Sequence, residues 1–422
     1  MTSTSRHRCV SLTNIRPFKP YLADPSRVGN VASPPSDSMS PQERAEFGAR
    51  HPDNFINAIR SIEEFPKTQL PSLEQLLQDN LAVLSRFLGD GSFVRELEPS
   101  LYIYEMICQD HSQKGIVAEV PVADYHAGTI RGHEDTRAEH EEHLFQYLNV
   151  VGATSSPICA AYRSKPRIDE IVSEITFGAP LLDFTDDYGV RQKVWRVSNR
   201  QVCGDLEELF GQISKLYVTD GHHRVASGIR HADRRSDDSN SDGPWNYLLM
   251  ALFPMDQMRI LPFNRCIRDI GDLSAEKMLD SLSNIFIIEE CHRDSLNNDG
   301  PQNRGEFILL FDNRCYRLNI PADCIPNHPV ESLDVSLLQS LVLEPLLNIR
   351  DPRSDPRLDY VTGELGLDGL RQRAESGWRL SFACYPPSFE ELVAVADAGL
   401  RMPPKSTCFD PKARSGIFVR TC

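Results

Sequence analysis

The feature that most constrains this chain is a stretch in which a short apolar strand runs directly into a helix. Leu216, Tyr217 and Val218 form a run of residues that favour β-strands. Asp220 and Gly221 follow and favour a tight turn. Beyond the turn, apolar side chains recur at helical spacing, namely Val225, Ala226, Ile229 and Ala232. The stretch therefore predicts a strand, a turn and a helix, a unit of folds that mix strands and helices.

The predicted turn presents residues that suit a phosphate group. It brings Gly221, His222, His223 and Arg224 to the start of the helix, where unpaired N–H groups and the helix dipole favour anions. Gly221 allows close backbone approach, and Arg224 can donate to two phosphate oxygens at once. The alternative is a solvated turn whose two histidines pack locally, and the turn alone favours neither interpretation.

The sequence Asp-Gly-His-His-Arg after a strand resembles the hallmark of the domain of unknown function 1015 family. Five further stretches resemble motifs of that family in the family's order: Ile15-Arg16-Pro17-Phe18, Pro34-Pro35 with Asp37, His133-Glu134-Asp135-Thr136, Leu261-Pro262-Phe263-Asn264-Arg265 and Met402-Pro403-Pro404-Lys405-Ser406-Thr407. On these residues the chain is identified as a member of the family from Asn14 to its C-terminus. One departure is Ser36, which stands where the family usually carries a tyrosine.

The resemblance implies a mixed α/β (α+β) fold of the ParB/sulfiredoxin-like superfamily, with a nucleotide-binding core. We expect a flexible arm over residues 1–13, the core over 14–268, an inserted α+β subdomain over 269–326, and a segment over 327–422 that returns to the core. Hydrophobic periodicity predicts hairpins within 101–122 and 306–320. It also predicts helices over 71–88, 137–149, 332–346 and 388–398. The polar stretch 231–243 predicts an exposed loop.

In that superfamily the turn holds nucleotide phosphates, and the same turn occurs in the ADP-dependent free-serine kinases. The resemblance therefore implies a small-molecule kinase that transfers a phosphoryl group from ATP or ADP to L-serine or a similar hydroxy acid. The turn, Gly221 to Arg224, would hold the donor phosphates. Glu134 would accept the proton of the substrate hydroxyl, and Asp220 would hold magnesium or the substrate amine. His223 completes the expected catalytic set, and Lys405 would neutralise developing charge. The expected substrate contacts are His133, Thr136, Ser406 and Thr407.

Other interpretations of these residues stay open. Glu134 precedes a predicted helix and would also complement its dipole. His133, His140 and His143 could ligate a metal, although no standard zinc spacing is present. The proline-rich segment around Lys405 could be a structural clamp. Arg265 could serve the fold or a ligand.

Two rival functions also remain. One is a nucleotide-binding switch of the ParB type, and the other is a ligand-binding protein without catalysis. A switch would respond to nucleotide alone, whereas a kinase would also respond to the hydroxy acid.

Composition limits the partners and the compartment. A net charge of −15 argues against a nucleic-acid partner, because such binding needs a basic surface. No apolar run is long enough to span a bilayer. The eleven cysteines include no C-x-x-C pair, which argues against a zinc ribbon or a disulfide framework and predicts a cytoplasmic setting. The oligomeric state is left open.

Overall fold

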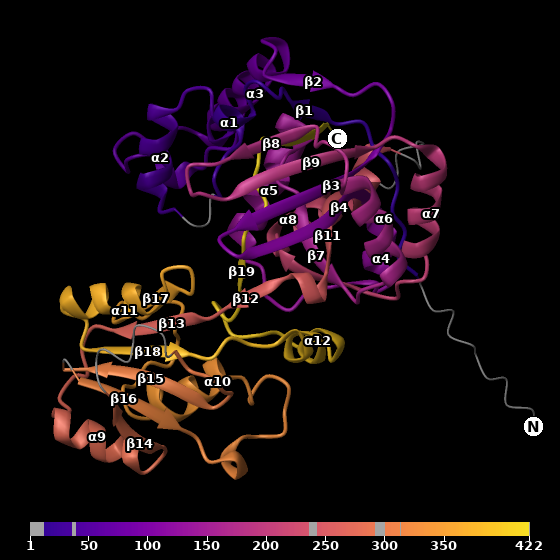
Figure 1. Cartoon of the computed structure of the whole chain (residues 1–422). Coiled ribbons are helices and arrows are strands. Elements are labelled where there is room, and N and C mark those ends of the chain that lie inside the picture. The colour runs from indigo at the N-terminus through magenta and orange to yellow at the C-terminus, as the bar shows by residue number, and fades with distance from the viewer. Residues whose placement is uncertain (1–11, 36–38, 236–242, 292–299, 313, 422) are drawn as a thin grey trace, which may run out of the picture. The chain divides into compact units, whose positions relative to one another are not determined.

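The computed structural model describes residues 12–35, 39–235, 243–291, 300–312 and 314–421. Most of the expected N-terminal arm, Ser36 and Asp37 of the second motif, and most of the polar stretch 231–243 lie outside these residues. The chain forms two compact units (Figure 1). Unit 1 contains residues 1–132, 136–258 and 411–422, and unit 2 contains residues 133–135 and 259–410. Within the described ranges, no helix has the length and apolar character needed to cross a membrane.

Unit 1 is built on an eight-stranded mixed sheet with the strand order β5-β10-β7-β11-β4-β3-β9-β8. The bounds of these strands are β3 Leu101–Cys108, β4 His111–Pro121, β5 Ile130–Arg131, β7 Ile158–Tyr162, β8 Leu182–Thr185, β9 Arg191–Val197, β10 Leu216–Asp220 and β11 Tyr247–Pro254. A smaller sheet joins β2 Phe93–Arg95, β1 Tyr21–Ala23, β20 Phe418–Thr421 and β6 Ala153–Thr154. The C-terminal strand β20 thus pairs with strands from the first half of the chain, whereas residues 327–410 of the expected returning segment belong to unit 2.

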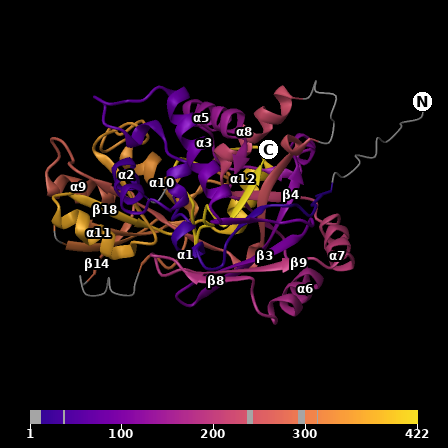
Figure 2. The same cartoon turned by 90° about the horizontal axis from the view of Figure 1, so that it is seen from above.

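The helices of unit 1 are α1 Val28–Val31, α2 Pro41–Arg50, α3 Leu73–Gly89, α4 Val122–His126, α5 Ala138–Val151, α6 Pro166–Thr176, α7 Arg200–Phe210 and α8 His222–Arg234. Successive residues of β3 alternate between two cores, because strand side chains point to opposite faces. Ile103 packs in a core that includes side chains of α6, α7 and α8. Tyr102 and Tyr104 pack in a second core with side chains of the N-terminal segment and β20. Helices α6 and α7 lie side by side (Figure 2).

Unit 2 is a six-stranded antiparallel sheet with the order β14-β16-β15-β18-β13-β17. The strands are β13 Phe263–Ile267, β14 Ile287–Cys291, β15 Glu306–Phe311, β16 Arg314–Asn319, β17 Leu358–Thr362 and β18 Leu380–Cys384. A separate pair joins β12 Arg259–Leu261 to β19 Cys408–Asp410. The helices are α9 Ala275–Ser283, α10 Asp334–Leu338, α11 Gly366–Glu375 and α12 Phe389–Asp397. Helices α9 and α10 contribute to one core, and α11 contributes to another.

The structure confirms most of the predicted elements. Both hairpins form, as β3 with β4 and as β15 with β16. The helix predicted over 137–149 is α5, and the one predicted over 388–398 is α12. The helix predicted over 332–346 is instead a short α-helix, α10, that continues as a π-helix over Gln339–Leu343. The exposed loop predicted over 231–243 is wrong for its first residues, because α8 extends to Arg234 and buries His231 and Ala232. Residues 236–242 lie outside the described residues.

The expected subdomain over 269–326 is only part of unit 2. Its hairpin, β15 and β16, completes a sheet through β18, which comes from residues 380–384. Strand β13 then pairs with both β17 and β18. The unit therefore extends over 259–410, since the strands that pair with its first half lie in the second half of the sequence.

The sequence analysis argued against a disulfide framework, yet unit 2 contains a disulfide. Cys291 of β14 lies directly opposite Cys315 of β16, and the two residues are bonded with a Cα–Cα distance of 5.3 Å. That distance lies in the usual range for disulfides. The pairing follows from the antiparallel register, whereas the two cysteines are 24 residues apart in the sequence.

Candidate functional site

The predicted phosphate turn lies where β10 ends and α8 begins. Gly221 precedes the first helical residue with a φ of 95° and a ψ of 31°, a left-handed conformation that favours glycine. No side chain caps this helix start, and its first turn carries no acidic residue. The residues there are His222, His223 and Arg224 instead. An uncapped start with basic side chains is the reverse of what the helix dipole ordinarily favours, and it suits an anion.

Arg224 fixes the turn to two neighbouring strands. Its guanidinium donates to the carboxylate of Asp220 at the end of β10. It also donates through Nη1 to the carbonyl of Pro157, just before β7, over 2.9 Å. A Cβ atom at Gly221 would lie 2.9 Å from Nε of Arg224. Glycine is therefore required here both for the backbone conformation and for the close approach of the arginine.

The two histidines of the turn have different surroundings. A Cβ atom at Gly132 would lie 3.1 Å from Cδ2 of His222, so these two residues pack closely. The ring of His223 lies 5.4 Å from that of His140. Burial, reinforced by His140 and Arg137, lowers the pKa of His223 below its ordinary value. The lowered pKa favours the neutral form of His223, and Arg224 contributes a positive charge to the turn.

A second group of predicted residues comes together in unit 2. Nε2 of His133 lies 3.2 Å from Oγ1 of Thr407, which donates in turn to Oε1 of Glu134 over 3.4 Å. The amide of Met402 donates to the carbonyl of His133 over 2.8 Å. His133 is fully buried, whereas 35% of the Glu134 side chain is exposed. Two motifs more than 250 residues apart in the sequence are thus joined, with the Glu134 carboxylate partly open to solvent.

The Lys405 segment is held by its own backbone and by Arg265. Ser406 is buried, and its hydroxyl donates to the carbonyl of Pro403 over 2.6 Å. Arg265, which is 4% exposed, donates to the carbonyl of Lys405 over 3.0 Å and to that of Phe263. Lys405 itself is exposed, and its φ is 57°. Arg265 therefore acts as a support for this loop, and the sequence could not distinguish that role from ligand binding.

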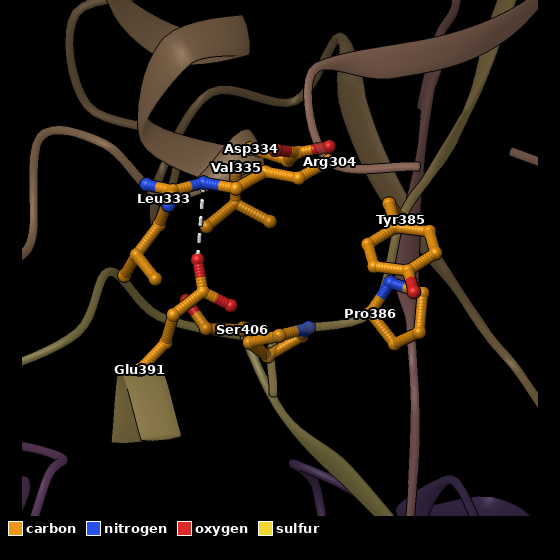
Figure 3. A pocket seen from close by; sticks show the side chains of 9 residues that line it. Arg304, Leu333, Asp334, Val335, Tyr385, Pro386, Glu391 and Ser406 are labelled. Carbon is orange, nitrogen blue, oxygen red and sulfur yellow. Dashed lines mark ion pairs between the residues drawn. The ribbon is translucent and has the colours of Figure 1, made fainter. Parts of the chain in front are cut away.

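A small cavity in unit 2 has Ser406 in its lining (Figure 3). Its volume is about 10 Å³, room for one water molecule. An ion pair of 3.2 Å between Arg304 and Glu391 closes one side. Burial raises the pKa of Asp334, another lining residue, to about 7. This cavity is too small for a hydroxy acid, so it is not a substrate site in this form.

Thr136 and the histidine cluster do not gather as expected. Oγ1 of Thr136 donates to Oε2 of Glu141 in the first turn of α5, over 3.3 Å. His140 lies 3.5 Å from Glu63, and burial lowers the pKa of His143. Across the described parts of the chain, no three His, Cys, Asp or Glu side chains are arranged to hold a metal ion. The structure therefore does not form the metal site considered from the sequence.

Asp220 is compatible with magnesium as a single ligand. Its carboxylate is 29% exposed and accepts from Arg224. Magnesium commonly binds one or two carboxylates together with phosphate oxygens and water, so one carboxylate beside a phosphate site is sufficient.

Sequence reasoning gave no role to Asp135, which lies between the predicted residues Glu134 and Thr136. Its carboxylate lies 3.6 Å from Arg353 and 3.6 Å from Arg401. It thus ties the 133–136 motif to the residue just before Met402. Its position inside a family motif could have indicated a role. The sequence could not identify its partners, because the two arginines lie more than 200 residues away.

A family model described as "Protein of unknown function (DUF1015)" matches residues 15–336. The chain belongs to this family. The match includes the turn after β10 and the motif at 133–136, and it ends before the Lys405 segment. None of the curated proteins matches the chain.

Three solved structures are similar to the chain at low identity. A free serine kinase in complex with AMP is 9% identical over 72% of this chain and 91% of that chain, with a TM-score of 0.35. A conserved hypothetical protein from Pyrococcus furiosus is 10% identical over 71% and 93%, with a TM-score of 0.34. SbnI with a C-terminal truncation, from Staphylococcus aureus, is 11% identical over 71% and 85%, with a TM-score of 0.38.

Proposed function

We propose that this protein is a small-molecule kinase. It binds the phosphates of an adenine nucleotide, ATP or ADP, at the start of α8. It transfers the terminal phosphoryl group to the hydroxyl of L-serine or of a similar small hydroxy acid. The observation that carries the proposal is the start of α8, which has Gly221 before it, Arg224 in its first turn, and neither an acidic residue nor a side-chain cap.

Phosphate binding follows from the chemistry of this turn. The first N–H groups of a helix have no partner within the helix, and the dipole adds about half a positive charge there. Gly221 leaves room for a phosphate to approach the backbone. Arg224 would exchange its contacts with Asp220 and Pro157 for phosphate oxygens, since one guanidinium can donate to two oxygens. His222 and His223 would contribute hydrogen bonds.

Glu134 is the proposed general base. It would take the proton from the substrate hydroxyl while the oxygen–phosphorus bond forms and the terminal phosphoryl bond of the donor breaks. The nucleotide then leaves with one phosphate fewer. Thr407 and His133 would orient the carboxylate.

Two further residues complete the proposed roles. Asp220 would hold magnesium or the substrate amine, and bound magnesium would offset the negative charge of the phosphates. Lys405, exposed on a loop supported by Arg265, would neutralise charge that develops during transfer. Ser406 is buried and hydrogen-bonded to Pro403, so we assign it to the loop rather than to the substrate.

The test is phosphorus NMR of the protein incubated with magnesium, a nucleotide and L-serine, in a panel that includes ATP, ADP and other small hydroxy acids. A kinase produces a new phosphomonoester signal with at least one nucleotide and acceptor. Glu134→Gln keeps the shape of the side chain and removes the base, so we expect transfer to fall by about 10²–10⁴-fold.

Glu139→Gln is the matched control, because Glu139 is an exposed residue of α5 with the same chemistry. Its transfer rate should equal that of the wild type. Nucleotide binding without any phosphomonoester, across the whole panel, would contradict the kinase and favour a nucleotide-binding switch.

A further inference from the structure

A second cavity lies entirely within unit 1, along one face of α8. Arg224, Ser227, Gly228 and His231 line it, and this spacing corresponds to one side of a helix. Trp245, Tyr247 and Leu248 line it from the start of β11 and the residues just before it. Leu144, Tyr147 and Leu148 of α5 add further apolar surface. The cavity volume is about 100 Å³. We refer to this space as the α8 cavity.

Two buried polar atoms of the α8 cavity have no hydrogen-bond partner among the described residues. They are Nε2 of His231 and Oγ1 of Thr154. His231 is only 2% exposed, and its ring packs edge-on against Phe145 with a centroid distance of 6.4 Å. An unsatisfied buried polar atom costs about 1–3 kcal/mol, so two around one cavity indicate a missing partner. Burial lowers the pKa of His231 to about 4, which leaves the ring neutral at pH 7.

The lining also restricts the chemistry of that partner. None of the described lining residues is acidic, so a cationic ligand would find no counter-charge. The guanidinium of Arg420, another lining residue, already donates to Glu119 and to the carbonyl of Pro244. Apolar and aromatic walls with two hydrogen-bonding atoms suit a flat heterocycle that presents polar atoms at its edge. A cavity of about 150 Å³ accepts one benzene ring, so the α8 cavity, which is partly open, can take the edge of such a ring.

The position of the α8 cavity relative to the phosphate turn identifies the heterocycle. Arg224 lies in the turn and also lines the α8 cavity. His231 follows Arg224 by seven residues, which is about 10 Å along a helix axis. We propose that the α8 cavity binds the purine base of the nucleotide whose phosphates are held at the start of α8, with His231 and Thr154 hydrogen-bonded to the edge of the base. This assignment rests on the proposed function, since it names the base subsite of the same nucleotide.

The experiment compares two ligands by calorimetry, ADP and inorganic pyrophosphate. Thr154→Val removes a hydroxyl without changing the shape, and His231→Leu removes the ring nitrogen. Each substitution should lower the affinity for ADP by about three- to tenfold, the effect of one lost hydrogen bond. Neither should change the affinity for pyrophosphate. Arg224→Ala should lower the affinity for both ADP and pyrophosphate. Thr185→Val is the matched control, because Thr185 is exposed at the end of β8. It should change the affinity for neither ADP nor pyrophosphate.

The outcomes separate this inference from the proposed function. If Arg224→Ala weakens both ligands while Thr154→Val and His231→Leu leave ADP affinity unchanged, the base subsite is overturned and the phosphate turn stands. If the wild type binds neither ADP nor pyrophosphate, both proposals fail. Should His231→Leu not fold, ring signals of His231 in NMR spectra of the wild type replace it. They should shift with ADP and not with pyrophosphate, and equal shifts with both would contradict the assignment.

Discussion

The polar groups at the start of α8 in unit 1 and those around the 402–407 segment in unit 2 differ in what they contact. In unit 1 the helix start has no side-chain cap, and Nε2 of His231 has no partner among the described residues. In unit 2, Thr407 contacts both His133 and Glu134, and Arg265 donates to the backbone of Lys405. The contacts around the 402–407 segment hold its shape, whereas Nε2 of His231 is a contact for the base in the inference above.

This difference suggests a division of roles. In the proposed function, the groups that bind the nucleotide belong to unit 1. The proposed general base, Glu134, belongs to unit 2, where it accepts a hydrogen bond from Thr407. Substitutions can remove the contacts that support the 402–407 segment in unit 2, or measure how buried side chains of the two units respond to pH.

The largest effect on stability should come from Arg265→Ala. The guanidinium is 4% exposed and donates to the carbonyls of Phe263 and Lys405. Its removal leaves these carbonyls without their donor, so we expect the free energy of unfolding to fall by about 3–5 kcal/mol. Urea denaturation measures this change.

Lys405→Ala is the control in the same loop, because Lys405 is exposed and its ammonium lies over the ring of Phe263, 5.2 Å from the ring centroid. It should cost less than about 1 kcal/mol. If Arg265→Ala is as mild as Lys405→Ala, Arg265 is not the support of this loop.

A buried histidine in unit 1 should make the free energy of unfolding depend on pH. Burial, with Arg235 and Arg420, lowers the pKa of His231 from 6.5 to about 4. Between these values the unfolded chain binds a proton that the folded chain does not, so stability falls as the pH falls from 6.5 to 4. The integrated loss is about 3 kcal/mol.

Asp334 in unit 2 should have the opposite pH dependence. Burial, with Glu391, raises its pKa from 3.8 to about 7, against a smaller opposing effect of Arg304. The folded carboxyl keeps a proton that the unfolded chain releases, so its contribution to stability is lost as the pH rises from 3.8 to 7. Compared with the wild type, the free energy of unfolding measured by urea denaturation should rise less with pH between about 4 and 6.5 in His231→Leu. In Asp334→Asn it should fall less with pH between about 4 and 7. A pH profile unchanged by either substitution would contradict these assignments.

The sequence predicted the phosphate turn because every signal for it is local. A strand, a glycine and an amphipathic helix within 20 residues determine the turn, and the structure confirms β10, Gly221 and α8. The start of α2 is determined just as locally, because Ser40 and Glu43 form both hydrogen bonds of a capping box there.

Long-range contacts could not be predicted in the same way. The role of Arg265 depends on carbonyls about 140 residues later, and the Cys291–Cys315 bond depends on strand register. The extent of unit 2 depends on the pairing of β13 with β17 and β18, which no local pattern encodes. The family resemblance suggested that the 133–136 and 402–407 motifs serve one site, and the hydrogen bond between Thr407 and Glu134 is the contact that joins them.

The most direct test of the division of roles is the affinity for ATP and ADP, measured by calorimetry in the wild type, Arg224→Ala and Glu134→Gln. Because a charge-assisted hydrogen bond contributes about 1.5–3 kcal/mol, Arg224→Ala should weaken nucleotide binding at least about tenfold. Glu134→Gln should bind with wild-type affinity, since its carboxylate acts on the acceptor. Equal affinity in the wild type and Arg224→Ala would contradict the account, because the start of α8 would then not be the phosphate site.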